Sequence, residues 1–384
     1  GPGLMTGLAM QLGGLGRQPL GPARGARALR SRGATSAAAL PSSRAGALGV
    51  QSLFSREEKP LTRQPTPADY AYVMPDEAPW PPPYATSSTQ GMRDYMEDVL
   101  HVKPQTRCGY FYAAVFDGHG GSISAAYLGN ERTGLHTVFS DCVDQDERVE
   151  VAPYLPEPLG LVCPLSLAPL MTKAFKKADN RLLRYLCELE DPDCFSGSTA
   201  TTVLLRKDTI IVANVGDSKA IIARGGQTVE LTLDHRVEGN SKVCKSETNR
   251  IKKAGGWVSD GRVCGILAVT RAFGDIDFKS SRFDLLEELR EAGVKEAKRA
   301  TMQKPVVVPT PDVTELGRKP DDEFLVLASD GVWDVVSADL VATLVRAKIN
   351  GGFGLQGAAD ALVQYALEAK STDNISVVVV DLRH

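Results

Sequence analysis

The chain has 384 residues, of which 43% are hydrophobic and 24% are charged, and its formal net charge at pH 7 is −3. This near-neutral balance argues against a nucleic-acid partner, which would require a basic surface. The sequence contains no stretch of about 18 uncharged apolar residues, so we expect any membrane association to be peripheral. The seven cysteines include no CxxC pair, which favours reduced thiols in an intracellular compartment over a disulfide or zinc framework.

Residues 1–58 are expected to be a disordered organelle transit peptide. The first 56 residues contain seven arginines, no lysine and no acidic residue, and they are rich in Ala, Gly and Ser. This composition is typical of a transit peptide, and a disordered tail of biased composition is the alternative. Residues 59–84 are rich in proline and include Trp80-Pro81-Pro82-Pro83, so we expect a linker there.

Residues 85–384 show the pattern of one mixed domain. In chain order, we expect a strand at 110–116, helices at 122–128 and 171–189, strands at 199–205, 209–214, 219–223 and 324–328, helices at 338–348 and 357–369, and a strand at 375–380. The three strands between 199 and 223 are predicted to form an antiparallel meander. Strands in runs and helices in pairs favour an α+β layered architecture over a doubly wound parallel sheet.

Acidic residues follow apolar runs at five places in this domain. They are Glu97, Asp98, Asp117, Asp217, Asp330, Asp334 and Asp373. Crowded carboxylates repel one another, so a protein that gathers several of them usually binds divalent cations there. Oxygen ligands suit Mg²⁺ or Mn²⁺ rather than Zn²⁺, which favours His and Cys. The sequence therefore predicts metal-assisted hydrolysis.

An ordered series of motifs over residues 86–382 resembles the type 2C, metal-dependent protein serine/threonine phosphatases. The motifs are Gly91-Met92-Arg93-Asp94-Tyr95-Met96-Glu97-Asp98, Phe116-Asp117-Gly118-His119-Gly120-Gly121, Ser196-Gly197-Ser198-Thr199-Ala200, Val215-Gly216-Asp217-Ser218, Leu233-Asp234-His235, Ala268-Val269-Thr270-Arg271-Ala272-Phe273-Gly274-Asp275, Ala328-Ser329-Asp330-Gly331-Val332-Trp333-Asp334 and Asp373-Asn374. The resemblance implies a four-layer α-β-β-α sandwich with two antiparallel sheets and flanking helices. It makes residues 85–384 the catalytic domain and residues 235–265 a flap beside the active site.

The resemblance also implies two Mn²⁺ or Mg²⁺ ions per active site and a weaker third. Asp117 would bridge the two ions, and the third site would use Asp217, Asp330 and Asp334. Without the other motifs, Asp217 reads as a turn residue. The metal-ligand set is Glu97, Asp117, Gly118, Asp330, Asp373, Asp217 and Asp334.

Three further residues are implied in catalysis. Arg93 would bind the substrate phosphate through its planar guanidinium. Asp98 would orient the attacking water, and His119 would protonate the leaving serine or threonine oxygen as a general acid. Asp275 is left out of the site as a structural residue that holds Arg271 or a turn.

Within this family, residues 253–279 resemble thylakoid-associated plant members that dephosphorylate light-harvesting antenna proteins in state transitions. This resemblance implies a chloroplast protein in the stroma or on the stromal face of the thylakoid, with phosphorylated antenna proteins as substrate, and we expect a monomer. The alternatives are a catalytically inactive relative that serves as a binding scaffold, and a mitochondrial phosphatase of the same family. The proline-rich insertion at about 143–170 has no counterpart in the thylakoid-associated members that the chain resembles. Cys244 and Cys264, near the flap, are either buried inert thiols or a redox pair.

Overall fold

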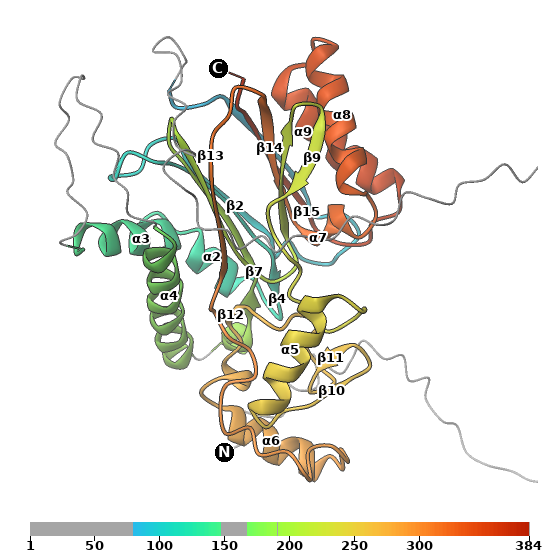
Figure 1. Cartoon of the computed structure of the whole chain (residues 1–384). Coiled ribbons are helices and arrows are strands. Elements are labelled where there is room, and N and C mark those ends of the chain that lie inside the picture. Colours follow the sequence, from blue (N-terminus) through green and yellow to red (C-terminus); the bar gives the residue numbers. More distant parts are fainter. Residues whose placement is uncertain (1–79, 147–166, 190, 384) are drawn as a thin grey trace, which may run out of the picture.

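The computed structural model describes residues 80–146, 167–189 and 191–383, and its centre is a pair of antiparallel sheets (Figure 1). The predicted transit peptide, most of the predicted linker and residues 147–166 of the insertion lie outside the described residues. No described helix is long and apolar enough to cross a membrane.

The first sheet has the strand order β13-β7-β6-β3-β2. Its strands are β2 (Val99–Lys103), β3 (Phe111–Phe116), β6 (Ala200–Leu205), β7 (Thr209–Val215) and β13 (Asp312–Gly317). All of its neighbouring strands are antiparallel.

The second sheet has the order β1-β15-β14-β8-β9 and is also antiparallel. Its strands are β1 (Tyr84–Thr89), β8 (Lys219–Arg224), β9 (Gln227–Glu230), β14 (Asp322–Ala328) and β15 (Ile375–Asp381). The expected meander is therefore correct only for β6 and β7, because β8 lies in the other sheet. Gly216, with a φ of +97°, stands in the turn between β7 and β8.

Alternating side chains fill the space between the sheets. In β3, Phe111, Ala113 and Val115 face the second sheet, where they pack with residues such as Leu325 and Val378. The intervening residues Tyr112, Ala114 and Phe116 face the helices on the other side. Every residue of this strand is buried, as the two-residue side-chain period predicts for a strand covered on both faces.

Helices cover the outer face of each sheet, which gives the predicted α-β-β-α sandwich (Figure 1). Apolar residues of α2 (Ile123–Leu128), α3 (Leu135–Asp144) and α4 (Ala168–Glu188) pack on the first sheet. Those of α7 (Asp330–Trp333), α8 (Ala338–Asn350) and α9 (Gly354–Glu368) pack on the second. The predicted helices at 122–128, 171–189, 338–348 and 357–369 are confirmed to within a few residues.

A separate apolar cluster joins the flap to residues 278–307. It includes Ile251, Trp257, Phe278, Leu286 and Met302. The elements of this region are α5 (Lys242–Lys253), β10 (Val258–Ser259), β11 (Arg262–Val263), the 3₁₀ helix η3 (Ile276–Phe278) and α6 (Arg282–Glu291). They lie together at one end of the sandwich (Figure 1).

Three two-residue strands form a small sheet of their own at the same end. They are β4 (Gly118–His119), β5 (Gly197–Ser198) and β12 (Phe273–Gly274), in the order β12-β5-β4. The 3₁₀ helix η2 (Pro192–Phe195) precedes β5. This small sheet brings together segments from three distant parts of the sequence.

Candidate metal centre

The predicted carboxylates come from neighbouring ends of antiparallel strands. Asp98 immediately precedes β2, Asp117 follows β3, Asp217 lies in the turn from β7 to β8, Asp330 follows β14 by two residues, and Asp373 precedes β15 by two. In antiparallel pairs the start of one strand lies beside the end of the next, so these positions share one edge of the sandwich.

The structure brings the candidate ligands into one pocket of about 560 Å³. Carboxylate oxygens of Asp117, Asp217 and Asp330 lie within 4.8 Å of one another. The pocket is also lined by the other predicted ligands and by the two residues predicted to act on substrate: Glu97, Gly118, Asp334, Asp373, Arg93 and His119.

Asp98 is buried at the start of β2. Its Oδ2 atom accepts a hydrogen bond from Ser329 Oγ at 2.8 Å. Burial raises the pKa of Asp98 to about 6. The hydrogen bond from Ser329 acts against this shift, and the charges of Asp373 and Glu97 add to it. Ser329, which adjoins Asp330, therefore links Asp98 to the end of β14.

Crowding raises the pKa of the central carboxyl groups. Burial, with the negative charges of Asp217, Asp334 and Asp373, raises the pKa of Asp330 to about 8. The pKa of Asp117 lies well above its usual range, because of burial first and then the neighbouring carboxylates. An all-oxygen donor set in which carboxylates are this crowded fits hard divalent cations.

Arg236 is a cation that the sequence analysis did not place in the site. Its guanidinium donates to Asp217 Oδ2 at 2.5 Å, to Asp330 Oδ2 at 2.7 Å and to Asp334 Oδ1 at 3.0 Å. These are the three carboxylates predicted for the third metal. Arg236 thus balances the charge at the position where that ion would bind.

Arg93 contacts another predicted ligand. Its Nη2 atom lies 2.6 Å from Asp373 Oδ2, and more than half of its side chain is exposed. The exposed guanidinium can reach a phosphate in the pocket once a cation takes over its partner carboxylate.

Asn374 fixes the loop that carries Arg93, Glu97 and Asp98. Its Nδ2 atom donates to the carbonyl oxygens of Gln90 (2.8 Å) and Tyr95 (3.0 Å), and its Oδ1 atom accepts from the backbone N–H of Glu97 at 2.8 Å. This amide is thus nearly saturated with backbone partners. The Asp373-Asn374 motif combines a candidate ligand with the side chain that positions the loop.

His119 is paired with Asp275, which the sequence analysis left out of the site. His119 Nε2 lies 2.8 Å from Asp275 Oδ1, and Asp275 is almost fully buried. Burial acts to lower the pKa of His119, but the charge and hydrogen bond of Asp275 outweigh it, so the pKa is raised. The interpretation of Asp275 as a partner of Arg271 is wrong.

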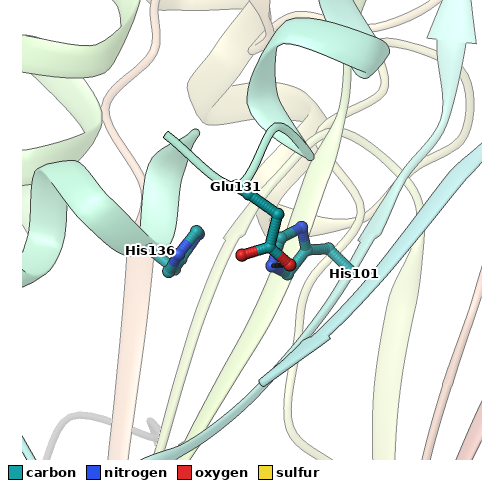
Figure 2. Close-up of side chains that lie close together, drawn as sticks. All are labelled: His101, Glu131 and His136. Carbon is teal, nitrogen blue, oxygen red and sulfur yellow. Dashed lines mark ion pairs between the residues drawn. The ribbon is translucent and has the colours of Figure 1, made fainter. Parts of the chain in front are cut away.

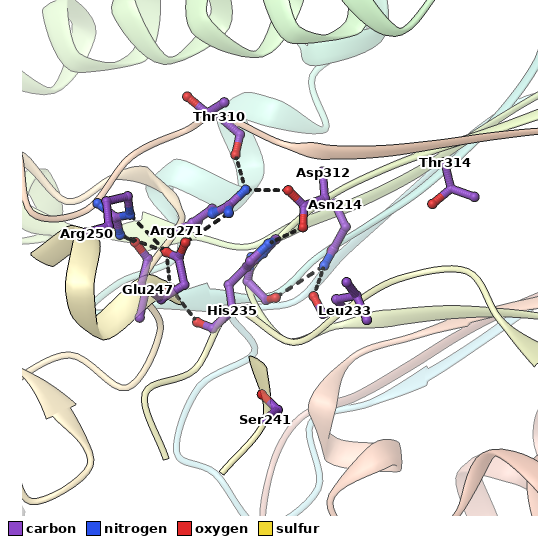
Figure 3. A network of polar contacts seen from close by, with 12 residues as sticks. Asn214, Leu233, His235, Ser241, Glu247, Arg250, Arg271, Thr310, Asp312 and Thr314 are labelled. Carbon is purple, nitrogen blue, oxygen red and sulfur yellow. Dashed lines mark hydrogen bonds and ion pairs between the residues drawn. The ribbon is translucent and has the colours of Figure 1, made fainter. Parts of the chain in front are cut away.

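Arg271 instead belongs to a polar network between the flap and the first sheet (Figure 3). Its guanidinium donates to Glu247 Oε1 of α5 at 2.9 Å and to Asp312 Oδ1 of β13 at 2.7 Å. His235 Nε2 donates to Asp312 Oδ2 at 3.2 Å, and its Nδ1 atom accepts from Gly216 N–H. Since Arg236 follows His235, this network holds Arg236 at the carboxylates.

Known proteins match most of this chain. The sequence profile described as "Protein phosphatase 2C" matches residues 83–375. The Arabidopsis thaliana protein named protein phosphatase 2C 57 is 38% identical over 299 residues, which cover 77% of this chain and 74% of that protein. A second Arabidopsis protein, probable protein phosphatase 2C 78, is 32% identical and covers 81% of this chain and 75% of its own length.

Two solved structures share the fold. The serine-threonine phosphatase 2C from Toxoplasma gondii superposes with a TM-score of 0.58 at 22% identity, over 79% of this chain and 98% of that one. A C. elegans sex determining protein gives a TM-score of 0.59 at 23% identity, over 79% of this chain and 65% of its own.

Proposed function

Because the chain belongs to the protein phosphatase 2C family, it is a metal-dependent protein serine/threonine phosphatase, and we propose that Mn²⁺ or Mg²⁺ ions bind between Glu97, Asp117, Gly118, Asp330 and Asp373. The observation that carries this proposal is the cluster of Asp117, Asp217 and Asp330 in a pocket that also contains Arg93 and His119. Two divalent cations held at this place would supply a water nucleophile active at neutral pH and positive charge that balances the phosphate.

The protein's own residues bind the substrate and move its protons. Arg93 is the group that binds the phosphate, since its exposed guanidinium lies at the pocket. His119, whose pKa is raised by Asp275, donates a proton to the leaving oxygen. Asp98 accepts a hydrogen bond from the attacking water, and Ser329 fixes its carboxylate.

Asp217 and Asp334 would hold the third, weaker ion. This binding requires Arg236 to move away, because its guanidinium now donates to both carboxylates. Competition with an internal cation explains why this third site would be weaker than the other two.

The proposed substrate is the phosphorylated light-harvesting antenna, with the enzyme at the stromal face of the thylakoid. The support is the resemblance of residues 253–279 and the arginine-rich, acid-poor N-terminal 56 residues. Imaging a fusion of residues 1–60 to a fluorescent protein in a plant or algal cell tests the location, and mitochondrial fluorescence would contradict it.

The catalytic proposal is tested by phosphate release from a phosphothreonine peptide with Mn²⁺ or Mg²⁺. The comparison uses the full chain, an EDTA control, Asp117→Asn, and Asp360→Asn as a matched change of an exposed carboxylate on α9. We expect metal-dependent release that Asp117→Asn abolishes and Asp360→Asn leaves unchanged. A folded, metal-loaded wild type with no activity would favour the scaffold function.

The substrate proposal needs a separate assay. Phosphorylated thylakoid membranes are incubated with the enzyme, and phosphothreonine on the antenna proteins is followed by immunoblotting beside a generic phosphothreonine peptide. Faster loss from the antenna supports the proposal. Equal rates on both substrates would reject the assigned specificity and leave the phosphatase activity intact.

A further inference from the structure

We propose that His101, Glu131 and His136 form a separate zinc site on the helical side of the first sheet. One ligand atom from each residue lies within 4.8 Å of the other two. Figure 2 shows the Glu131 carboxylate beside the two imidazole rings, whose centroids lie 4.6 Å apart. His101 comes from β2, Glu131 from the loop between α2 and α3, and His136 from the first turn of α3.

Each histidine has a buried ring nitrogen with no hydrogen-bond partner in the described part of the chain. These atoms are His101 Nε2 and His136 Nδ1, and both residues are only 7% exposed. His101 Nε2 points to Glu131 Oε1 at 3.9 Å. A buried nitrogen without a partner is energetically costly, and a bound cation would remove this cost.

The outer hydrogen bonds leave these two nitrogens unprotonated. His101 Nδ1 is bonded to the carbonyl oxygen of Gly129, which can only accept, so Nδ1 carries the hydrogen and Nε2 carries a lone pair. Thr137 Oγ1 donates its one hydrogen to the carbonyl of Glu131, so it accepts from His136 Nε2 at 3.1 Å. The lone pair of His136 is then on Nδ1.

This arrangement is the one found around metal-binding histidines, whose second ring nitrogen is held by a carbonyl or another acceptor. Burial keeps the pKa of His101 below its usual range, and burial together with His101 lowers the pKa of His136 to about 4. With one ring proton and one free lone pair each, as their hydrogen bonds require, both rings are in the neutral form that binds metals.

The donor set favours zinc over the ions of the carboxylate centre. Two imidazoles and one carboxylate form a known zinc ligand set, which leaves the fourth tetrahedral position open, whereas Mg²⁺ prefers oxygen ligands. Tetrahedral zinc bonds of about 2.0–2.1 Å place ligand atoms about 3.3 Å apart. Binding would therefore require the exposed Glu131 side chain to move inward and the two imidazole rings, whose centroids lie 4.6 Å apart, to turn their free nitrogens towards the ion.

Lys103 opposes cation binding, because its ammonium is paired with Glu131 Oε2. The other oxygen, Oε1, faces His101, so one carboxylate can serve both partners. A bound ion would tie the α2–α3 loop to β2, the strand that follows Glu97 and Asp98. Zinc would thus stabilise the element that presents two residues of the catalytic pocket.

The test is zinc binding by the full chain in excess Mg²⁺, measured by competition with a chromophoric chelator. Asp117→Asn is included so that zinc at the carboxylate centre is not counted. Glu131→Gln removes an exposed ligand with little risk to folding, and Glu230→Gln on β9 is the matched control. Thr137→Val removes the partner of His136 without removing a ligand.

We expect one zinc equivalent in the wild type, in Asp117→Asn and in Glu230→Gln. Thr137→Val should weaken zinc binding by roughly 10- to 100-fold, and Glu131→Gln by more. X-ray absorption of the zinc-loaded protein should show imidazole nitrogens at about 2.0–2.1 Å. Equal zinc affinity in the wild type and Glu131→Gln, or a zinc with only oxygen neighbours, would overturn the proposal.

Discussion

His119 and Asp275 approach each other across Gly197, with 2.8 Å between Nε2 and Oδ1. The small sheet β12-β5-β4 brings the two residues together, and Gly197 occupies the middle strand. A Cβ atom at Gly197 would lie 2.3 Å from His119 Nε2 and 2.4 Å from Asp275 Oδ1. The motif Ser196-Gly197-Ser198-Thr199 therefore needs glycine at its second position, because any side chain there would separate His119, the proposed general acid, from Asp275.

Gly197→Ala should therefore lower kcat by about 100-fold, the lower end of the usual contribution of general acid catalysis. The added methyl group separates His119 from Asp275 but leaves the metal ligands and Arg93 in place, so KM and metal affinity should change little. Steady-state kinetics on a phosphothreonine peptide, with the metal concentration varied, measures all three quantities. An equal loss in metal affinity would show that the change disrupts the centre itself.

Asp275→Asn should shift the pH dependence of kcat. The charge of Asp275 holds the pKa of His119 above its usual value, so its loss lowers that pKa, and the protonated acid is depleted at a lower pH. The alkaline limb of the profile should move towards lower pH. Asp284→Asn, an exposed change on α6, is the control, and an unmoved limb in Asp275→Asn would contradict the role of the pair.

Arg236→Ala should destabilise the metal-free protein and strengthen binding of the third metal ion. Without the guanidinium, Asp217, Asp330 and Asp334 lose their shared cation, which should cost on the order of 2 kcal/mol for charged hydrogen bonds at a partly exposed site. Urea unfolding in EDTA should show this loss, and added Mg²⁺ should reverse it. Arg236→Lys keeps the positive charge, so its free energy of unfolding in EDTA should lie between those of the wild type and Arg236→Ala.

Metal affinity should rise with pH between about 6 and 8. In the metal-free protein, burial and neighbouring charges raise the pKa of Asp98 to about 6 and that of Asp330 to about 8, so cation binding must release protons. The raised pKa of Asp330 also makes the stability of the fold depend on pH. The stabilisation is complete below pH 3.8, the pKa of this carboxyl group in the unfolded chain, and it is lost as pH rises through about 8.

Calorimetry in buffers of different ionisation enthalpy measures this proton release. We expect more protons released per Mg²⁺ at pH 6.5 than at pH 9, and a smaller difference in Asp330→Asn. Equal release at both pH values would mean that the carboxylates are already ionised before the metal binds.

The candidate ligands could be predicted from the sequence because short motifs carry them. Asp117-Gly118-His119 and Asp330-Gly331 stand at the ends of apolar strands, and the structure places Asp330 in one pocket with the first three. The path of β8 was not predictable from side-chain pattern, because strands buried on both faces lack the alternation that would assign them to a sheet.

Contacts between side chains that are distant in the sequence could not be predicted either. The contact between His119 and Asp275 depends on three two-residue strands and on a left-handed φ of +51° at Asp275. The position of Arg236 depends on the network that fixes His235 (Figure 3). The signal available for Arg236 was its place after the Leu233-Asp234-His235 motif.

Glu247 should contribute stability that is lost in acid. Burial acts to raise its pKa, but hydrogen bonds from Arg271 and Arg250 outweigh burial and lower the pKa to about 2. A lowered carboxyl pKa stabilises the fold above the unfolded value of 4.5, and this stability is lost as pH falls through about 2. Glu247→Gln should therefore lower the free energy of unfolding at pH 7 by on the order of 3 kcal/mol, with a smaller difference at pH 3. Urea unfolding at both pH values measures these free energies, with the exposed Glu291→Gln as control. The same difference between wild type and Glu247→Gln at pH 7 and pH 3 would show that the carboxylate charge is not what joins the flap to β13.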